Sequence, residues 1–152
     1  MKTDILIAGS GCAGLYCALN LPKDKEITII TKKDAECSDS FLAQGGMCAL
    51  KDEKDFQSFF DDTLKAGHFE NNEEAVKIMI SSSPDVVCDL ESYGVEFEKN
   101  ADGSYAYTKE GAHSEKRILF HEDITGKEIT SKLLSEAKKR NNIKIKEYTQ
   151  EL

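Results

Sequence analysis

The sequence has no long apolar run, no clustered positive charge and no pair of closely spaced cysteines. A membrane-spanning helix needs about 20 consecutive apolar residues, and no segment of the chain approaches that length. The 20 lysines and arginines are scattered among 28 acidic residues, and the net charge is −8. A nucleic-acid interface needs a basic stripe, so this charge pattern argues against one. We therefore expect neither a membrane nor a nucleic acid among the partners of these residues.

The five cysteines form neither a Cys-x-x-Cys pair nor the Cys/His spacing of a metal site. Their odd number and apolar neighbours indicate reduced thiols in a cytoplasmic protein. No signal peptide is expected, because the charged residues Lys2 and Asp4 lead directly into the first apolar segment. The sequence thus predicts no metal centre and a cytoplasmic location.

The most informative segment is an apolar run that ends in three glycines. Residues 5–8 are apolar and lead directly into Gly9-x-Gly11-x-x-Gly14. Such a motif lies between a strand and a helix. The first glycine permits a tight turn, the second lets the backbone approach a pyrophosphate, and the third lets the helix pack closely on the strand. The N–H groups at the start of the helix then hold the phosphates. The segment predicts a dinucleotide site.

Hydrophobic periodicity and turn residues predict the other elements. Helices are expected over residues 13–21, 56–66, 72–82, 83–93 and from 125 onward, where Ile129, Leu133, Leu134 and Ala137 share one face. Strands are expected at 5–8, 26–31, 117–121 and 143–148, with a hairpin joining 95–98 to 104–108 and a structured loop at 33–50. The fold class is α/β, a Rossmann-like domain with a parallel sheet and flanking helices.

The residues at the end of the second predicted strand are compatible with two different cofactors. Many dinucleotide sites carry an acid there to hold the ribose, whereas this chain has Thr31 and Lys32. A basic residue at this place is typical of a site for the 2′-phosphate of NADP. It is equally suited to the adenosine end of a flavin dinucleotide.

Further motifs resemble those of the L-aspartate oxidases, a family within the succinate dehydrogenase and fumarate reductase flavoproteins. In chain order they are the glycine turn, Ser40-x-x-Ala43-Gln44-Gly45-Gly46, Glu110-Gly111-Ala112-His113-Ser114, Arg117-Ile118-Leu119 and Asp123-x-Thr125-Gly126. The glycine turn is shared with many flavoproteins, whereas Ala-Gln-Gly-Gly narrows the choice to the succinate dehydrogenase and fumarate reductase group. The Glu-Gly-x-His-Ser loop points to the L-aspartate oxidases. The resemblance implies that residues 1–152 are the N-terminal part of an FAD-binding domain, with the capping domain and the C-terminal helical domain absent.

The resemblance also implies that FAD binds without a covalent bond, because Asp39 stands where succinate dehydrogenases typically carry the flavin-linking histidine. Backbone N–H groups of residues 43–46 are expected near N5 and O4 of the flavin, although the Gln44 amide can equally cap a turn. The expected FAD-binding residues are Gly9, Ser10, Gly11, Cys12, Ala13, Gly14, Lys32, Asp39, Ser40, Phe41, Leu42, Ala43, Gln44, Gly45 and Gly46.

Two residues of the Glu-Gly-x-His-Ser loop are candidates for catalysis. The resemblance assigns Glu110 to the ammonium group that distinguishes L-aspartate from succinate, through a charge-assisted hydrogen bond. A solvated loop acid is the alternative. His113 either contacts a substrate carboxylate or the flavin, or braces the loop. Arg117 is expected to be structural.

The activity implied by the resemblance is oxidation of L-aspartate to iminoaspartate, with oxygen or fumarate reoxidising the flavin. The product feeds quinolinate and NAD synthesis, so quinolinate synthase is the expected functional neighbour. The 152 residues alone are expected to be inactive, because the proton-transfer group of the family lies outside them. Two alternatives stay open: a soluble fumarate reductase or succinate dehydrogenase flavoprotein, and a non-catalytic nucleotide-binding module that associates with a second chain.

Overall fold

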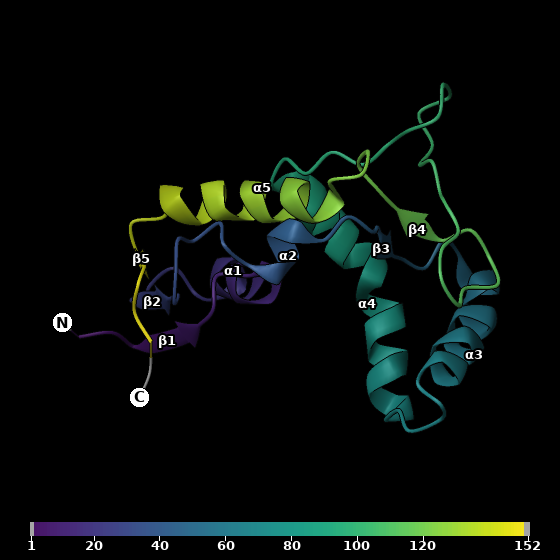
Figure 1. Cartoon of the computed structure of the whole chain (residues 1–152), viewed down its shortest axis with the longest axis horizontal. Helices are drawn as coiled ribbons and strands as arrows, with labels where there is room; N and C mark the ends of the chain where they lie inside the picture. The colour runs from purple at the N-terminus through teal and green to yellow at the C-terminus, as the bar shows by residue number, and fades with distance from the viewer. Residues whose placement is uncertain (1, 151–152) are drawn as a thin grey trace. The chain divides into compact units, whose positions relative to one another are not determined.

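A computed structural model describes residues 2–150, which form two compact units. Unit 1 comprises residues 2–44, 93–95 and 124–150, and unit 2 comprises residues 45–92 and 96–123. Each unit has its own sheet and its own helices, which are labelled in Figure 1. Among the residues described, no helix combines the length and the apolar character that crossing a membrane would need.

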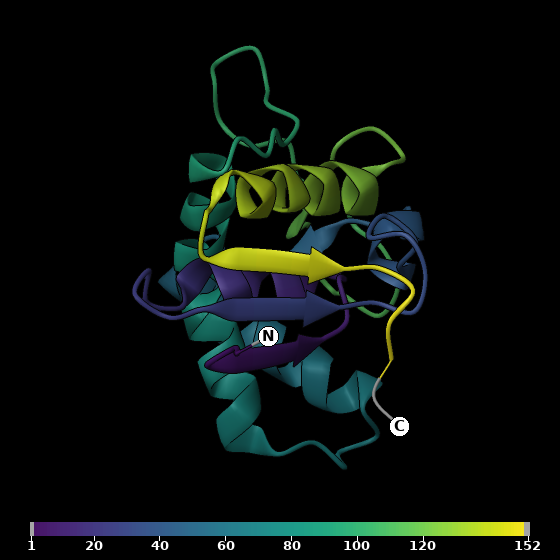
Figure 2. The ribbon, with the colours of Figure 1, turned by 90° about the vertical axis from the view of Figure 1, so that its left-hand side faces the viewer.

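Three parallel strands form the sheet of unit 1 in the order β1, β2, β5, and they lie side by side in Figure 2. The strands are β1 (Ile5–Ala8), β2 (Ile27–Ile30) and β5 (Ile143–Lys146). Ile27 in the central strand pairs with Ile5 on one side and with Ile143 on the other. All four residues of β2 are buried, which is why that strand is a continuous run of apolar and β-branched residues. The predicted parallel sheet is confirmed.

Two helices pack on this sheet. α1 (Cys12–Asn20) lies against β1 and β2, α5 (Thr125–Lys139) lies against β5, and the two helices pack on each other. Both helices therefore cover the same face of the sheet. Their buried residues recur at helical spacing: Leu15, Ala18 and Leu19 in α1, and Ile129, Leu133, Leu134 and Ala137 among those in α5. The apolar face predicted for the last helix is confirmed.

A short helix that the sequence did not predict, α2 (Asp39–Leu42), packs against α5. The Oγ atom of Ser38 caps it by accepting a hydrogen bond from the N–H of Phe41 at 3.2 Å. Gly126 makes the contact possible, because a Cβ atom there would overlap the carbonyl oxygen of Ser40. One helical turn escapes a periodicity search because four residues contain no full repeat of the pattern.

Unit 2 combines a two-stranded antiparallel sheet with two helices. The strands are β3 (Met47–Cys48) and β4 (Ile118–Leu119), and the helices are α3 (Phe56–Ala66), which follows a 3-10 turn at Glu53–Asp55, and α4 (Glu73–Ser92). The side chains of Phe59, Val76 and Ile80 form the buried centre between the helices. The predictions of a helix over 56–66 and of a strand within 117–121 are confirmed.

The prediction of two helices over residues 72–93 is wrong, because α4 runs through Pro84 without a break. Proline has no N–H, so it leaves the carbonyl oxygen of Ile80 without its helical donor. The hydroxyl of Ser83 replaces that donor at 2.7 Å. The same Oγ atom accepts a hydrogen bond from the N–H of Leu50 at 2.9 Å, which fixes the segment after β3 to the helix.

The hairpin predicted across residues 95–108 forms only in part. Lys99 and Tyr105 make an isolated antiparallel bridge, and the N–H of Gly103 donates to the carbonyl oxygen of Asn100 at 2.9 Å to close the turn. Two full strands are absent among these described residues. The hydroxyl of Tyr105 instead donates to Glu91 of α4 at 2.7 Å, so the turn is held by the helix.

Replacing Ser83 tests this account of α4. We expect Ser83→Ala to lower the free energy of unfolding by about 1–3 kcal/mol, because it leaves two half-buried backbone groups without a partner. Urea unfolding followed by circular dichroism measures the change. Ser82→Ala is the matched control, since its hydroxyl bonds only to carbonyls of its own helix, and it is expected to shift stability by less than about 0.5 kcal/mol. Equal effects of the two substitutions would contradict the account.

Candidate functional site

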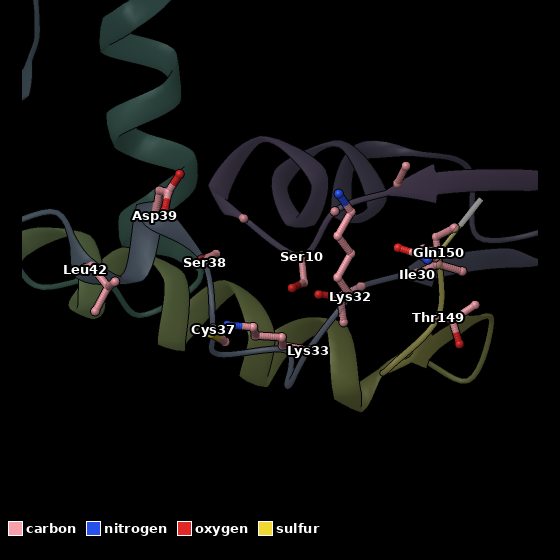
Figure 3. A pocket seen from close by; sticks show the side chains of 14 residues that line it. Ser10, Ile30, Lys32, Lys33, Cys37, Ser38, Asp39, Leu42, Thr149 and Gln150 are labelled. Atoms are coloured by element: carbon pink, nitrogen blue, oxygen red, sulfur yellow. The ribbon is translucent and has the colours of Figure 1, made fainter. Parts of the chain in front are cut away.

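A cavity of about 620 Å³ opens in unit 1 where the parallel strands end (Figure 3). Ala8 and Ile30 are the last residues of β1 and β2, and both line it. Thr149 and Gln150, which follow β5, line it as well. Ligands of open α/β sheets bind outside the carboxyl ends of the strands, so this cavity occupies the expected place for a nucleotide.

The glycine turn forms one wall of the cavity. Gly9 has a φ of +110°, a left-handed conformation that an L side chain rarely adopts, and its N–H donates to the carbonyl oxygen of Ile30 at 2.8 Å. A Cβ atom at Gly14 would overlap the carbonyl oxygen of Gly9, so only glycine lets α1 start this close to the turn. The buried hydroxyl of Ser10 donates to the carbonyl oxygen of Ala35 at 2.9 Å and fixes the turn to the segment after β2.

The start of α1 offers donors for an anion. The first N–H groups of a helix have no partner within it, and Gly11 at the N-cap position provides no side-chain cap. The N–H of Cys12 donates to the hydroxyl of Ser40 at 3.2 Å, which ties the start of α1 to α2. Burial raises the pKa of the Cys12 thiol, so this side chain adds no negative charge beside the helix start. The helix dipole adds positive potential at this end. These features fit a diphosphate group.

Lysines and an acid complete the rim of the cavity. Lys32 and Lys33, which follow β2, both line the cavity, as does Asp39 at the start of α2 (Figure 3). Asp39 carries a carboxylate, which cannot form the histidine-type covalent bond to a flavin. The site is therefore suited to a nucleotide held by backbone N–H groups and by lysine charge.

The structure brings together six of the expected FAD-binding residues on the cavity wall: Gly9, Ser10, Gly11, Lys32, Asp39 and Leu42. The others in unit 1 lie beside the wall in α1, in α2 or directly after α2, whereas Gly45 and Gly46 belong to unit 2. Sequence reasoning missed Lys33, Cys37, Ser38, Thr149 and Gln150. The rule that parallel strands share their carboxyl edge would have indicated Thr149 and Gln150, because they follow the last predicted strand.

In unit 2, the Glu110 carboxylate lies next to the second glycine pair. A Cβ atom at Gly45 would be 3.5 Å from Oε2 of Glu110. At Gly46 a Cβ atom would overlap Ile118 and the backbone of Leu119, so β3 and β4 can approach each other only because this residue is glycine. The two glycines therefore differ: Gly46 permits the strand pairing, whereas a Cβ atom at Gly45 would only be in ordinary contact with the Glu110 carboxylate.

Arg117 is the largest fully buried side chain among the described residues, with an exposed fraction of 0%. Its Nη2 lies 2.8 Å from Oδ1 of Asp55 and its Nη1 lies 2.7 Å from Oδ2 of Asp62. Burial alone would raise the pKa of both acids, but the hydrogen bonds and charge of Arg117, with Ser114 bonding Asp62, outweigh it and lower both pKa values. Two ion pairs thus hold Arg117 inside unit 2, in keeping with the structural role expected for it.

His113 is turned toward the interior of unit 2. Its Nε2 lies 3.0 Å from Sγ of Cys48 and its Nδ1 lies 3.0 Å from Nη1 of Arg117. Burial and the charge of Arg117 lower the pKa of the imidazole against the opposing effect of Asp62 and Asp55. The contacts of the His113 ring are therefore with Cys48 and Arg117 of the same unit. No group of three or more metal-ligating side chains is found within residues 2–150.

Comparison with known proteins decides between the cofactors. A family described as the FAD binding domain matches residues 4–150. The chain belongs to the FAD binding domain family. The L-aspartate oxidase of Clostridium perfringens is 49% identical over 142 residues, 93% of this chain and 32% of that protein. The L-aspartate oxidase of Clostridium acetobutylicum is 47% identical over 151 residues, 99% of this chain and 35% of that protein.

A solved structure of a quinol fumarate reductase variant from E. coli superposes on this FAD binding domain with a TM-score of 0.92. The two sequences are 25% identical, and the match covers 97% of this chain and 26% of that one. These findings confirm FAD as the cofactor and the resemblance to the L-aspartate oxidases. The chain spans about a third of the length of the curated L-aspartate oxidases that it matches.

Charge reversal on the cavity rim tests the nucleotide site of the FAD binding domain. We expect Lys32→Glu to weaken FAD binding about tenfold. The substitution removes an attraction to the nucleotide and adds a repulsion, and the two effects together are worth about 1.4 kcal/mol. Quenching of flavin fluorescence measures the affinity. Lys23→Glu is the control, since Lys23 lies in the turn before β2 and does not line the cavity. A Lys32 variant that keeps its FAD affinity but loses NADP binding would contradict the assignment.

Removing the buried arginine tests the electrostatics of unit 2. We expect Arg117→Met to lower the free energy of unfolding at neutral pH by about 3–5 kcal/mol, because it leaves two shielded carboxylates without a counter-charge. Lys138→Met, on the exposed face of α5, is the control.

The pH dependence has a defined sign. The lowered pKa values of Asp55 and Asp62 stabilise the wild type above the usual aspartate pKa of about 3.9, and this stability is lost as the pH falls through the folded-state values. Without Arg117, burial favours the protonated form of Asp55 and Asp62. Acid therefore removes the unpaired negative charges that destabilise the variant. The stability difference between the two proteins should therefore shrink as the pH falls from 7 toward about 4. A constant difference in urea unfolding across this range would contradict the prediction.

Proposed function

We propose that residues 1–152 are the N-terminal part of the FAD-binding domain of an L-aspartate oxidase, which oxidises L-aspartate to iminoaspartate. One observation carries the proposal: L-aspartate oxidases match 93–99% of the chain at 47–49% identity. The fumarate reductase variant matches a similar share of the chain at 25% identity. In this proposal, the capping domain and the C-terminal helical domain belong to the part of the enzyme outside these residues.

The cavity of unit 1 has the groups that the diphosphate and adenosine of FAD require. The N–H groups at the start of α1 bind and orient the diphosphate, and the turn from Gly9 to Gly14 keeps side chains out of its way. Lys32, which lines the same cavity, would lie beside the adenosine ribose. Bound FAD supplies an acceptor for the hydride that leaves Cα of the amino acid.

Glu110 binds the substrate ammonium group in this proposal. Its side chain is exposed beside Gly45, and it forms no ion pair with another described residue, so its charge is available to a cation. A carboxylate at this place attracts the ammonium group of an amino acid. It offers no such interaction to succinate, which lacks that group. A charge-assisted hydrogen bond of this kind is worth about 1.5–3 kcal/mol.

The remaining assignments of the proposal combine this activity with the charge and cysteine pattern of the sequence. Oxygen or fumarate reoxidises the flavin, and the imino product feeds NAD biosynthesis through quinolinate synthase. The protein is cytoplasmic and binds neither nucleic acid nor membrane. The fold similarity to a fumarate reductase keeps a soluble fumarate reductase or succinate dehydrogenase flavoprotein as the second candidate.

Substitution of Glu110 tests the proposal. Because the chain spans about a third of its relatives, turnover is measured on the complete gene product loaded with FAD. We expect Glu110→Gln to lower kcat/KM for L-aspartate about 10- to 100-fold, since the amide keeps the shape and removes the charge. Loss of flavin absorbance on mixing with substrate gives the rate. Glu115→Gln, an exposed acid of the same loop, is the matched control.

Each alternative predicts a different result. An L-aspartate turnover that survives Glu110→Gln unchanged would overturn the ammonium-binding role. A gene product that reduces fumarate with an external donor and leaves L-aspartate untouched would favour the fumarate reductase. Retention of FAD with neither activity would favour a non-catalytic nucleotide-binding module.

A further inference from the structure

The imidazole of His113 lies between a thiol and a guanidinium group in unit 2. Sγ of Cys48 is 3.0 Å from Nε2, and Nη1 of Arg117 is 3.0 Å from Nδ1. The ring also packs edge-on against Phe59, with the ring centres 5.5 Å apart. The imidazole is therefore held from three sides.

Arg117 decides which nitrogen of His113 carries the proton. A guanidinium group only donates hydrogen bonds, so Nδ1 of His113 must accept. In the neutral ring the proton is then on Nε2, which donates to Sγ of Cys48. All five N–H groups of Arg117 are used: its Nε binds Asp55, its Nη1 binds Asp62 and His113, and its Nη2 binds Asp55 and Ser58.

Cys48 is suited to the acceptor role. It is half-buried in β3, and burial raises the pKa of its thiol above the usual value, so the sulfur stays protonated and unreactive at neutral pH. It lies on a second cavity of about 220 Å³, together with Phe59, Asp62 and Met79. The charged and titratable groups that face His113 are Cys48 from β3, Asp55 and Asp62 from the segment leading into and along α3, and Arg117.

The same contacts fix the loop that carries Glu110. The N–H and the hydroxyl of Ser114 both donate to Oδ2 of Asp62, at 2.6 and 2.8 Å. The N–H of His113 donates to the carbonyl oxygen of Glu110 at 3.4 Å. Residues 110–114 are thus tied to α3 through Ser114 and to β3 through His113. Without the contact to Cys48, His113 keeps its hydrogen bond to Arg117 and its packing against Phe59 but loses its link to β3, so the Glu110 end of the loop is held less firmly.

We propose that His113 is a positioning residue: as a neutral ring protonated on Nε2, it donates to Cys48 and thereby holds Glu110 beside Gly45. The substrate part of this proposal rests on the proposed function, because it takes Glu110 as the ammonium ligand. Cys48 is the acceptor that completes the contact, and Arg117 sets the tautomer. The sequence motif contains His113 but not Cys48, and only the structure shows that the two side chains are in contact.

The first test uses the 152-residue chain and needs no activity. Nitrogen NMR of ¹⁵N-histidine-labelled protein reports the tautomer, with His113→Gln assigning the signals. We expect the Nε2-protonated neutral form at pH 7. A cationic ring or an Nδ1-protonated ring would overturn the proposal.

The second test measures the loop itself by amide hydrogen exchange. We expect Cys48→Ala to speed exchange over residues 110–114 about fivefold, the effect of losing roughly 1 kcal/mol. Cys48→Ser, whose hydroxyl also accepts a hydrogen bond, should restore most of the protection. Cys88→Ala, an exposed cysteine of α4, is the control. Unchanged exchange in Cys48→Ala would overturn the proposal.

The third test connects the loop to substrate in the FAD-loaded complete gene product. We expect Cys48→Ala to raise KM for L-aspartate about 3- to 10-fold with kcat changed less than about twofold, because the loop binds substrate and takes no part in the chemistry. An equal fall in kcat at unchanged KM would overturn the positioning role. If no version turns over L-aspartate while the first two tests succeed, the proposed function fails and the hydrogen-bonded brace stands.

Discussion

The close approach of α1 to the end of β1 is the constraint on which the nucleotide site depends. A Cβ atom at Gly14 would overlap the carbonyl oxygen of Gly9, and Gly9 itself has a left-handed φ of +110°. Only this tight junction brings the start of α1, where Gly11 has no side chain to cap the helix, to the carboxyl edge of the sheet. The cavity, its donors and its ligand class follow from that junction, because backbone N–H groups and a helix dipole recognise phosphate whatever the neighbouring side chains are.

Unit 2 depends on a different kind of constraint, a buried charge. Taking the Arg117 guanidinium out of water costs several kcal/mol, and the cost is offset only because Asp55 and Asp62 lie at 2.7–2.8 Å and every N–H has an acceptor. A network in which every donor has an acceptor restrains the side chains that take part in it. The restraint extends from Arg117 to His113, and from His113 to the loop that begins at Glu110.

The elements that could be predicted are those whose signal is local. The three parallel strands, the glycine turn and the apolar face of α5 each follow from the order of residues within a short segment. The continuity of α4 could not be predicted, because it requires knowing that the Ser83 hydroxyl replaces the donor that Pro84 lacks. Likewise, Cys48 and His113 are 65 positions apart in the chain, and nothing in either neighbourhood indicates that they meet.

These two constraints explain how one fold supports different substrates. Backbone N–H groups that hold a diphosphate would make few demands on the neighbouring side chains, and a fumarate reductase variant at 25% identity superposes on this chain with a TM-score of 0.92. Substrate selection requires a particular charge at a particular place, and in the proposed function one carboxylate provides it. A loop that moved freely would lose part of that discrimination to the entropy of ordering Glu110 on each binding event. In the proposed function, a buried arginine that fixes the loop before substrate binds would remove this cost, which gives a physical reason for burying a charged group next to the loop of an exposed acid.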